Sequence, residues 1–224
     1  MSYFPYKSDD LGQNQKLGIV LAPAGGYANH VRLLCFLSNQ ANAYIFPKIK
    51  LQKLKHKIQF IKKYIYFQER TWHNWLSVEW QYRQQFDRSE FAVSHNLNLL
   101  NTNYEQTNKF LGIYVEPETC YKSYLKFNSN IDSTPKENFI TYCYNWFIKC
   151  KELSVKYNKL KVIDCNVLQN PILDKDLYEE IINWFEIDNQ YEHACEIHSI
   201  WFDLHRKAEK EFVQDITKIY SDNP

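Results

Sequence analysis

Short apolar runs alternate along the chain with longer segments in which apolar residues recur every three or four positions. The runs of strand length occur at 16–22, 90–94, 109–115 and 160–165. They are mostly apolar rather than apolar at every second residue, which is typical of strands that are covered on both faces. The pattern predicts an α/β fold of three layers, with a mainly parallel central sheet and helices on both faces.

In the first half of the chain, three helices are expected. One begins directly after Gly26, where apolar residues return at helical spacing. A second spans 50–67, where Leu51 and Leu54 begin a helical repeat and the lysines between the apolar residues form a solvated face. The third, at 70–86, carries tryptophans near one side, which indicates a core-facing helix more often than a ligand cage.

Helix-start signals mark the second half. Pro117 suits the first position of a helix, where its missing N–H costs nothing. Thr134 and Glu137 form a capping-box pattern, and Asp174 is a candidate cap for the next helix. A stripe at helical spacing in the last segment predicts a packed helix face rather than a metal site. Its members are Ala194, His198, Trp201, His205, Ala208 and Phe212.

Composition and charge narrow the class of protein. The 224 residues suffice for one buried core, and we expect a single domain over 17–220 that follows a polar tail, 1–16. The net charge of +1 gives no overall field that would attract nucleic acid or an anionic membrane. The chain has neither an apolar run of membrane-spanning length nor a signal-peptide pattern, so a cytoplasmic location is expected. The six cysteines lack metal-ligand spacing and predict buried free thiols, with no metal.

The stretch VLAPAGGYANHVRLL (20–34) carries the main chemical signal. It holds two adjacent glycines in a chain that has only 5. One interpretation is a tight strand-to-helix turn, and the other is an anion site, because a helix N-terminus favours phosphate. Ligands of parallel sheets bind at the carboxyl ends of the strands, where this turn lies. Ser94, His95, Glu116 and Asn166 follow the other three strands, so the position favours the anion site.

Several pieces in this order resemble the sulfotransferases that use 3′-phosphoadenosine 5′-phosphosulfate (PAPS). The segment PAGG (23–26) matches their Pro-x-x-Gly phosphate loop, and FAVSHNL (91–97) matches their Ser-His pair. In VEPETCYKS (115–123), a Ser follows the Pro by six residues, as in the family. The resemblance spans most of 17–212. It implies a fold like that of P-loop nucleotide hydrolases and transfer of a sulfuryl group from PAPS to a hydroxyl of a small molecule or glycan.

The resemblance also implies site residues. His95 would be the catalytic base that deprotonates the acceptor, a role that suits histidine near neutral pH; the alternative is a loop histidine that caps a turn. His30 is the second catalytic candidate, as a donor to a phosphate or sulfuryl oxygen; the alternative is an ordinary residue of the first helical turn. The positions expected to hold PAPS as co-substrate are Pro23, Gly25, Gly26, Tyr27, Ala28, Asn29, Arg32 and Ser123.

The loop departs from the family pattern where charge is usual. The family places Lys or Arg after the Pro and Ser or Thr after the Gly, but this chain has Ala24, Tyr27 and Ala28 there. Arg32 either folds back over the anion in compensation or points to solvent. Glu116 would repel an adjacent phosphate, so the nucleotide could differ from PAPS.

Two other functions stay open. The segment GGYANH (25–30) resembles the Gly-Gly-x-Gly-Asn-Gln stretch of fucosyltransferases, which implies a glycosyltransferase that uses a sugar nucleotide. The missing charged residues favour a different alternative, a sulfotransferase-like binding module without catalysis. The expected partners are thus a nucleotide and a hydroxyl-bearing acceptor. Nucleic acid is not expected, because no basic patch with interleaved aromatic residues occurs.

Overall fold

The structure is a computed structural model that describes residues 16–41, 43–45, 49–51, 53–59, 61–62, 91–102, 105, 107–127 and 135–203. Its strands are β1 (Lys16–Leu21), β2 (Ala43–Ile45), β3 (Ile49–Leu51), β4 (Phe91–Ser94), β5 (Thr107–Tyr114) and β6 (Leu160–Asp164). Its labelled helices are α1 (Ala28–Phe36), α4 (Leu99–Thr102), α5 (Pro117–Phe127), α6 (Lys136–Lys156) and α7 (Lys175–Phe185). Residues 54–59, 61–62 and 191–203 are also helical, and Asn166–Gln169 form a 3-10 turn.

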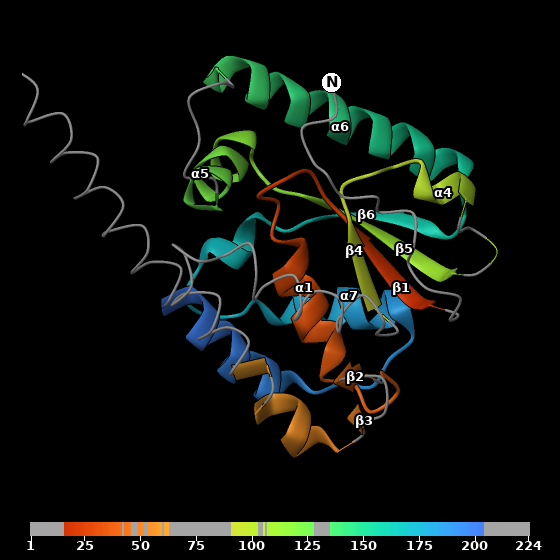
Figure 1. The fold of residues 1–224 in the computed structure, drawn as a ribbon, viewed down its shortest axis with the longest axis vertical. Coiled ribbons are helices and arrows are strands. Elements are labelled where there is room, and N and C mark those ends of the chain that lie inside the picture. The colour runs from red at the N-terminus through yellow and green to blue at the C-terminus, as the bar shows by residue number, and fades with distance from the viewer. Residues whose placement is uncertain are drawn as a thin grey trace, which may run out of the picture.

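Four of the described strands form one parallel sheet in the order β4-β1-β5-β6. In this sheet β1 is interior, since Leu21 pairs with Ser94 on one side and with Gly112 on the other. In Figure 1, α6 covers one face of the sheet, and α1 and α7 cover the other. The predicted α/β architecture and its four strands are confirmed, with strand ends that differ from the expected ones by one or two residues.

The core explains why these strands are mostly apolar. Ile19, Leu111 and Ile163 are buried in neighbouring strands between the two helical layers. The expected buried free thiols are confirmed too: all six cysteines lie in the described segments and are free, five of them buried. Burial raises the pKa of the Cys150 thiol to about 12, so this thiol is an inert part of the core.

The segment at 43–62 differs from its prediction. Strands β2 and β3 form an antiparallel pair, so Leu51 lies in a strand and the helix begins only at Leu54. Three-residue strands are too short to show a periodic pattern, which is why the sequence suggested helix from 50 onward. Lys57 is not on a solvated face: it is fully buried, and its Nζ donates to the carbonyl oxygens of Ser38 and Ala41 after the end of α1. Carbonyls at a helix C-terminus favour a cation.

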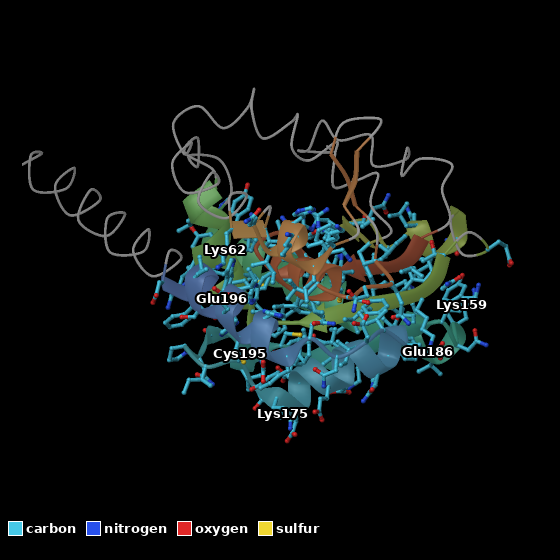
Figure 2. All side chains as sticks on the ribbon, turned by 90° about the horizontal axis from the view of Figure 1, so that it is seen from below. Lys62, Lys159, Lys175, Glu186, Cys195 and Glu196 are labelled. Atoms are coloured by element: carbon cyan, nitrogen blue, oxygen red, sulfur yellow. The ribbon has the colours of Figure 1, made fainter. Side chains whose placement is uncertain are left out.

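The C-terminal helix, at 191–203, lies beside the helical residues 61–62. An ion pair between Lys62 Nζ and Glu196 Oε1 joins it to the helical residues 61–62 (Figure 2). No described helix is both long and apolar enough to cross a membrane. Of the expected polar tail, 1–16, the structure describes only Lys16, which begins β1. The end of the expected second helix (63–67) and the tryptophan helix expected at 70–86 lie outside the described residues, as do His205, Ala208 and Phe212 of the C-terminal stripe.

Two of the three helix-start predictions are confirmed. Pro117 is the first residue of α5, and Asp174 Oδ1 accepts a hydrogen bond from the Leu177 N–H at 2.8 Å. α6 starts at Lys136, and its N-cap is Pro135, which makes no side-chain cap bond. Proline has no side-chain acceptor, but its φ of −52° lies near the helical value. Thr134 of the expected capping box lies outside the described residues, so the capping box stays a prediction.

Candidate functional site

Hydrogen bonds join the segments that follow the four parallel strands in two pairs. The Ala22 N–H donates to the Ser94 carbonyl at 3.2 Å, and the Ala22 carbonyl bonds to His95 Nδ1 at 2.7 Å. On the other side of β1, the Glu116 N–H donates to Asn166 Oδ1 at 2.8 Å. The segment after β1, which leads into the glycine loop, is therefore bonded to the segment after β4, and the segment after β5 is bonded to the segment after β6.

The loop between β1 and α1 is a tight turn. The Gly26 N–H donates to the Pro23 carbonyl at 3.0 Å, and Gly25 has a φ of 78°. A positive φ at the third residue is the requirement of a type II turn. A Cβ on Gly25 would lie 2.1 Å from the Cys120 carbonyl oxygen, so α5 packs directly on this glycine. The turn interpretation is thus confirmed, and anion binding remains a prediction.

The N-terminus of α1 follows this turn. Its first helical bond runs from the Val31 N–H to the Tyr27 carbonyl, so the N–H groups of Ala28, Asn29 and His30 have no acceptor within the helix. Tyr27 is the N-cap residue and has a left-handed conformation, and its side chain makes no described cap bond. The first turn contains no acidic residue. These features give the helix end a partial positive charge that favours an anion.

The ring of His95 is oriented by the loop. A carbonyl oxygen can only accept, so Nδ1 of neutral His95 carries the proton and Nε2 carries the lone pair. Ala22 lies directly against Gly26, since a Cβ added to Gly26 would be 2.9 Å from the Ala22 Cβ. Because His95 is bonded to Ala22, its imidazole lies within about 10 Å of the Gly26 backbone. The expected closeness of His95 to the glycine turn is confirmed. The bond between His95 and the Ala22 carbonyl is the kind that a histidine capping a turn would make, so it agrees with that alternative. The same bond fixes the tautomer in which Nε2 can act as a base.

His30 is part of a buried histidine pair. It is 1% exposed, and its Nε2 lies 2.9 Å from Nδ1 of His198, whose Nε2 lies 2.8 Å from the Asn170 carbonyl oxygen. The Trp201 ring stacks on His30 with 4.0 Å between ring centroids. The packed, hydrogen-bonded face predicted for His198 and Trp201 is confirmed. Burial lowers the pKa of His198 below its ordinary value, although the bond to Asn170 opposes this shift.

This pair determines which atoms of His30 can donate. The Asn170 carbonyl places the proton of neutral His198 on Nε2, so His198 Nδ1 accepts from His30 Nε2. Neutral His30 then has no proton on Nδ1. From Nδ1, His30 could donate to an anion only as an imidazolium. The catalytic role of His30 stays a prediction with this added condition.

Arg32 and Ser123 are both buried. Arg32 is 2% exposed, so the alternative that it points to solvent is wrong. Ser123 is 3% exposed on α5, in the helical turn whose backbone at Cys120 and Tyr124 packs on Gly25. The structure therefore brings the turn that carries Ser123 to the glycine loop, as the site prediction requires.

Sequence reasoning missed the long-range partners at this edge. The His30–His198 bond joins residues 168 positions apart, and Asn170 acts through its backbone carbonyl, which leaves no sequence pattern. Asn166 was expected at this edge, but its bond to the Glu116 N–H was not. For the His30–His198 pair, the sequence offered one indication, the stripe at helical spacing that contains His198 and Trp201.

The described residues contain no group of three side chains that could hold a metal ion. Comparisons with protein-family models, curated proteins and solved structures find no match to this chain. The proposed function therefore rests on the parallel sheet and on the hydrogen-bonded segments at its carboxyl edge.

Proposed function

We propose that this chain is a sulfotransferase-like enzyme with a P-loop-like fold, which binds PAPS at the carboxyl edge of β1 and sulfates a hydroxyl of a small molecule or glycan. The observation that carries the proposal is the bond between His95 Nδ1 and the Ala22 carbonyl. It holds a histidine with its lone pair on Nε2 beside a glycine turn and a helix N-terminus. A general base and an anion site are the two requirements of sulfuryl transfer.

In the proposed reaction, His95 Nε2 takes the proton of the acceptor hydroxyl while the acceptor oxygen attacks sulfur. A new sulfur–oxygen bond forms as the bond between sulfur and the 5′-phosphate oxygen breaks, and adenosine 3′,5′-bisphosphate leaves. The N–H groups at the start of α1 and the Asn29 side chain would hold the 5′-phosphate end. The Ser123 hydroxyl would donate to the 3′-phosphate.

The positive charge at this site would come from a different position than in the phosphate loop of the sulfotransferases, which carries Lys or Arg after its Pro. Ala24 takes the place of the usual cation and is buried, whereas Arg32 places a buried cation one helical turn after Ala28. Interior charges act more strongly than exposed ones because water screens them less. The Tyr114 hydroxyl donates to Glu116 Oε1 at 3.2 Å, which reduces the charge that this carboxylate presents to an anion.

Calorimetry with adenosine 3′,5′-bisphosphate and an assay with radiolabelled PAPS test the proposal. His95→Ala should lower turnover by about 10²–10⁴-fold and leave donor binding nearly unchanged. The matched control is His56→Ala, which removes an exposed histidine from the helix at 54–59. Ser123→Ala should weaken binding of the bisphosphate but not of adenosine 5′-monophosphate, which lacks the 3′-phosphate.

Each alternative function predicts a different outcome of the same experiments. Absence of bisphosphate binding at millimolar ligand would overturn the proposal. Binding of a guanosine diphosphate sugar instead would select the fucosyltransferase-like alternative. Bisphosphate binding without transfer to any hydroxyl would select the non-catalytic binding module.

A further inference from the structure

The outward face of α6 carries an apolar stripe. Tyr144 and Ile148 are 49% and 57% exposed, and Val155 is 89% exposed. They are spaced four and seven residues apart, so they share one face of the helix. Ile140, four residues before Tyr144, is half-buried and extends the stripe. Apolar side chains of this size, aligned along one exposed face, indicate a surface that contacts another protein.

Two opposite charges flank the centre of this stripe. Glu137 and Lys151 lie seven residues before and after Tyr144, on the same helix face. Both are exposed, and within the described part of the chain neither forms an ion pair. Glu137 therefore precedes the apolar residues Ile140, Tyr144 and Ile148, and Lys151 follows them, whereas Val155 lies beyond Lys151 on the same face. A surface of this kind is complementary to its own copy when the two are antiparallel.

We propose that the outward face of α6 binds a second copy of this chain, with the two α6 helices antiparallel about a two-fold axis at Tyr144. Residues equally far from Tyr144 on either side then face each other. Ile140 meets Ile148 of the partner subunit, and Glu137 meets Lys151 of the partner subunit. A parallel arrangement would place like charges together, and a two-fold axis at Ile148 would face Tyr144 with Glu152 of the partner subunit.

The size of this surface sets the strength of the dimer. The 21 residues of α6 span about 30 Å at 1.5 Å per residue. One helix face of this length buries less than the about 800 Å² per partner of a stable complex. We therefore expect a dimer that exchanges with monomer and forms at high micromolar concentration. Because its ion pairs are exposed, added salt should weaken it.

Sedimentation velocity of the full chain, from micromolar to millimolar concentration, tests the proposal. Glu137→Lys and Lys151→Glu should each weaken the dimer about tenfold or more, because each places like charges face to face twice in the symmetric contact. The double variant should restore dimerisation, because the same pairs form again with exchanged signs. Lys149→Glu makes the same charge change off the stripe and should leave the dimer unchanged.

Three results would overturn the inference: a wild-type chain that stays monomeric to millimolar concentration, a double variant no tighter than the single ones, or a Lys149→Glu variant as weak as Lys151→Glu. All three positions are exposed, so the variants should keep the circular dichroism spectrum of the wild type. The inference does not depend on the proposed function, since none of these residues belongs to the carboxyl edge.

Discussion

Gly25→Ala tests how the turn at the centre of the site is held. Gly25 has a φ of 78°, and an added Cβ would lie 2.1 Å from the Cys120 carbonyl oxygen and 3.0 Å from the Tyr124 nitrogen. Both contacts are with the backbone of α5, which cannot rotate away as a side chain can. Either α5 or the turn must therefore move to admit one methyl group.

Two effects add to the expected loss. A left-handed conformation costs a residue other than glycine about 1–2 kcal/mol. Overpacking against a rigid neighbour costs about 1–3 kcal/mol. The free energy of unfolding should fall by their sum, about 2–5 kcal/mol, out of the about 5–15 kcal/mol of a typical domain. For a chain of this length, each kcal/mol lowers the Tm by about 2–4 °C, so we expect a decrease of about 4–20 °C.

Urea unfolding followed by circular dichroism measures this loss, and Gly25→Asn separates its two parts. Asparagine tolerates the left-handed conformation better than alanine but carries the same Cβ, so this variant should still lose about 1–3 kcal/mol. Lys122→Ala, on the exposed side of α5, should stay within about 0.5 kcal/mol of the wild type. If Gly25→Asn is as stable as the wild type, close packing by α5 is not the reason for glycine here.

Two further predictions concern other parts of the fold. Glu186 follows α7 in a left-handed conformation with a φ of 57°, and its side chain forms an ion pair with Lys109. Glu186→Gly and Glu186→Ala both remove the ion pair, but only glycine relieves the backbone strain of the left-handed conformation. Urea unfolding should find the glycine variant more stable by about 1 kcal/mol, and equal stability would contradict the strain. Because the pKa of His198 is lowered in the folded state, the unfolded chain binds a proton there first, and wild-type stability should fall as the pH drops below 6.5. His198→Asn should show a shallower fall, and identical slopes would refute this assignment.

The amino-acid sequence by itself determined the features that depend on near neighbours in the chain. The four parallel strands follow from short runs that are mostly apolar and do not alternate, as burial on both faces predicts. Pro117 and Asp174 mark helix starts through their own backbone and side-chain chemistry. The position of His95 near the glycine turn also followed, because the carboxyl ends of neighbouring parallel strands share one edge of the sheet.

The tertiary structure decided the environment of each polar side chain. Lys57 was expected on a solvated face, and Arg32 was expected either over an anion or in solvent. Both are buried, because their surroundings come from segments that the local pattern does not contain. The bond between His30 and His198 needs α1 and the C-terminal helix to pack together, and the need for Gly25 depends on the approach of α5 as well as on the turn. A local pattern indicates that a face is buried, but the partner atoms of a buried polar group are set by contacts between residues far apart in the chain.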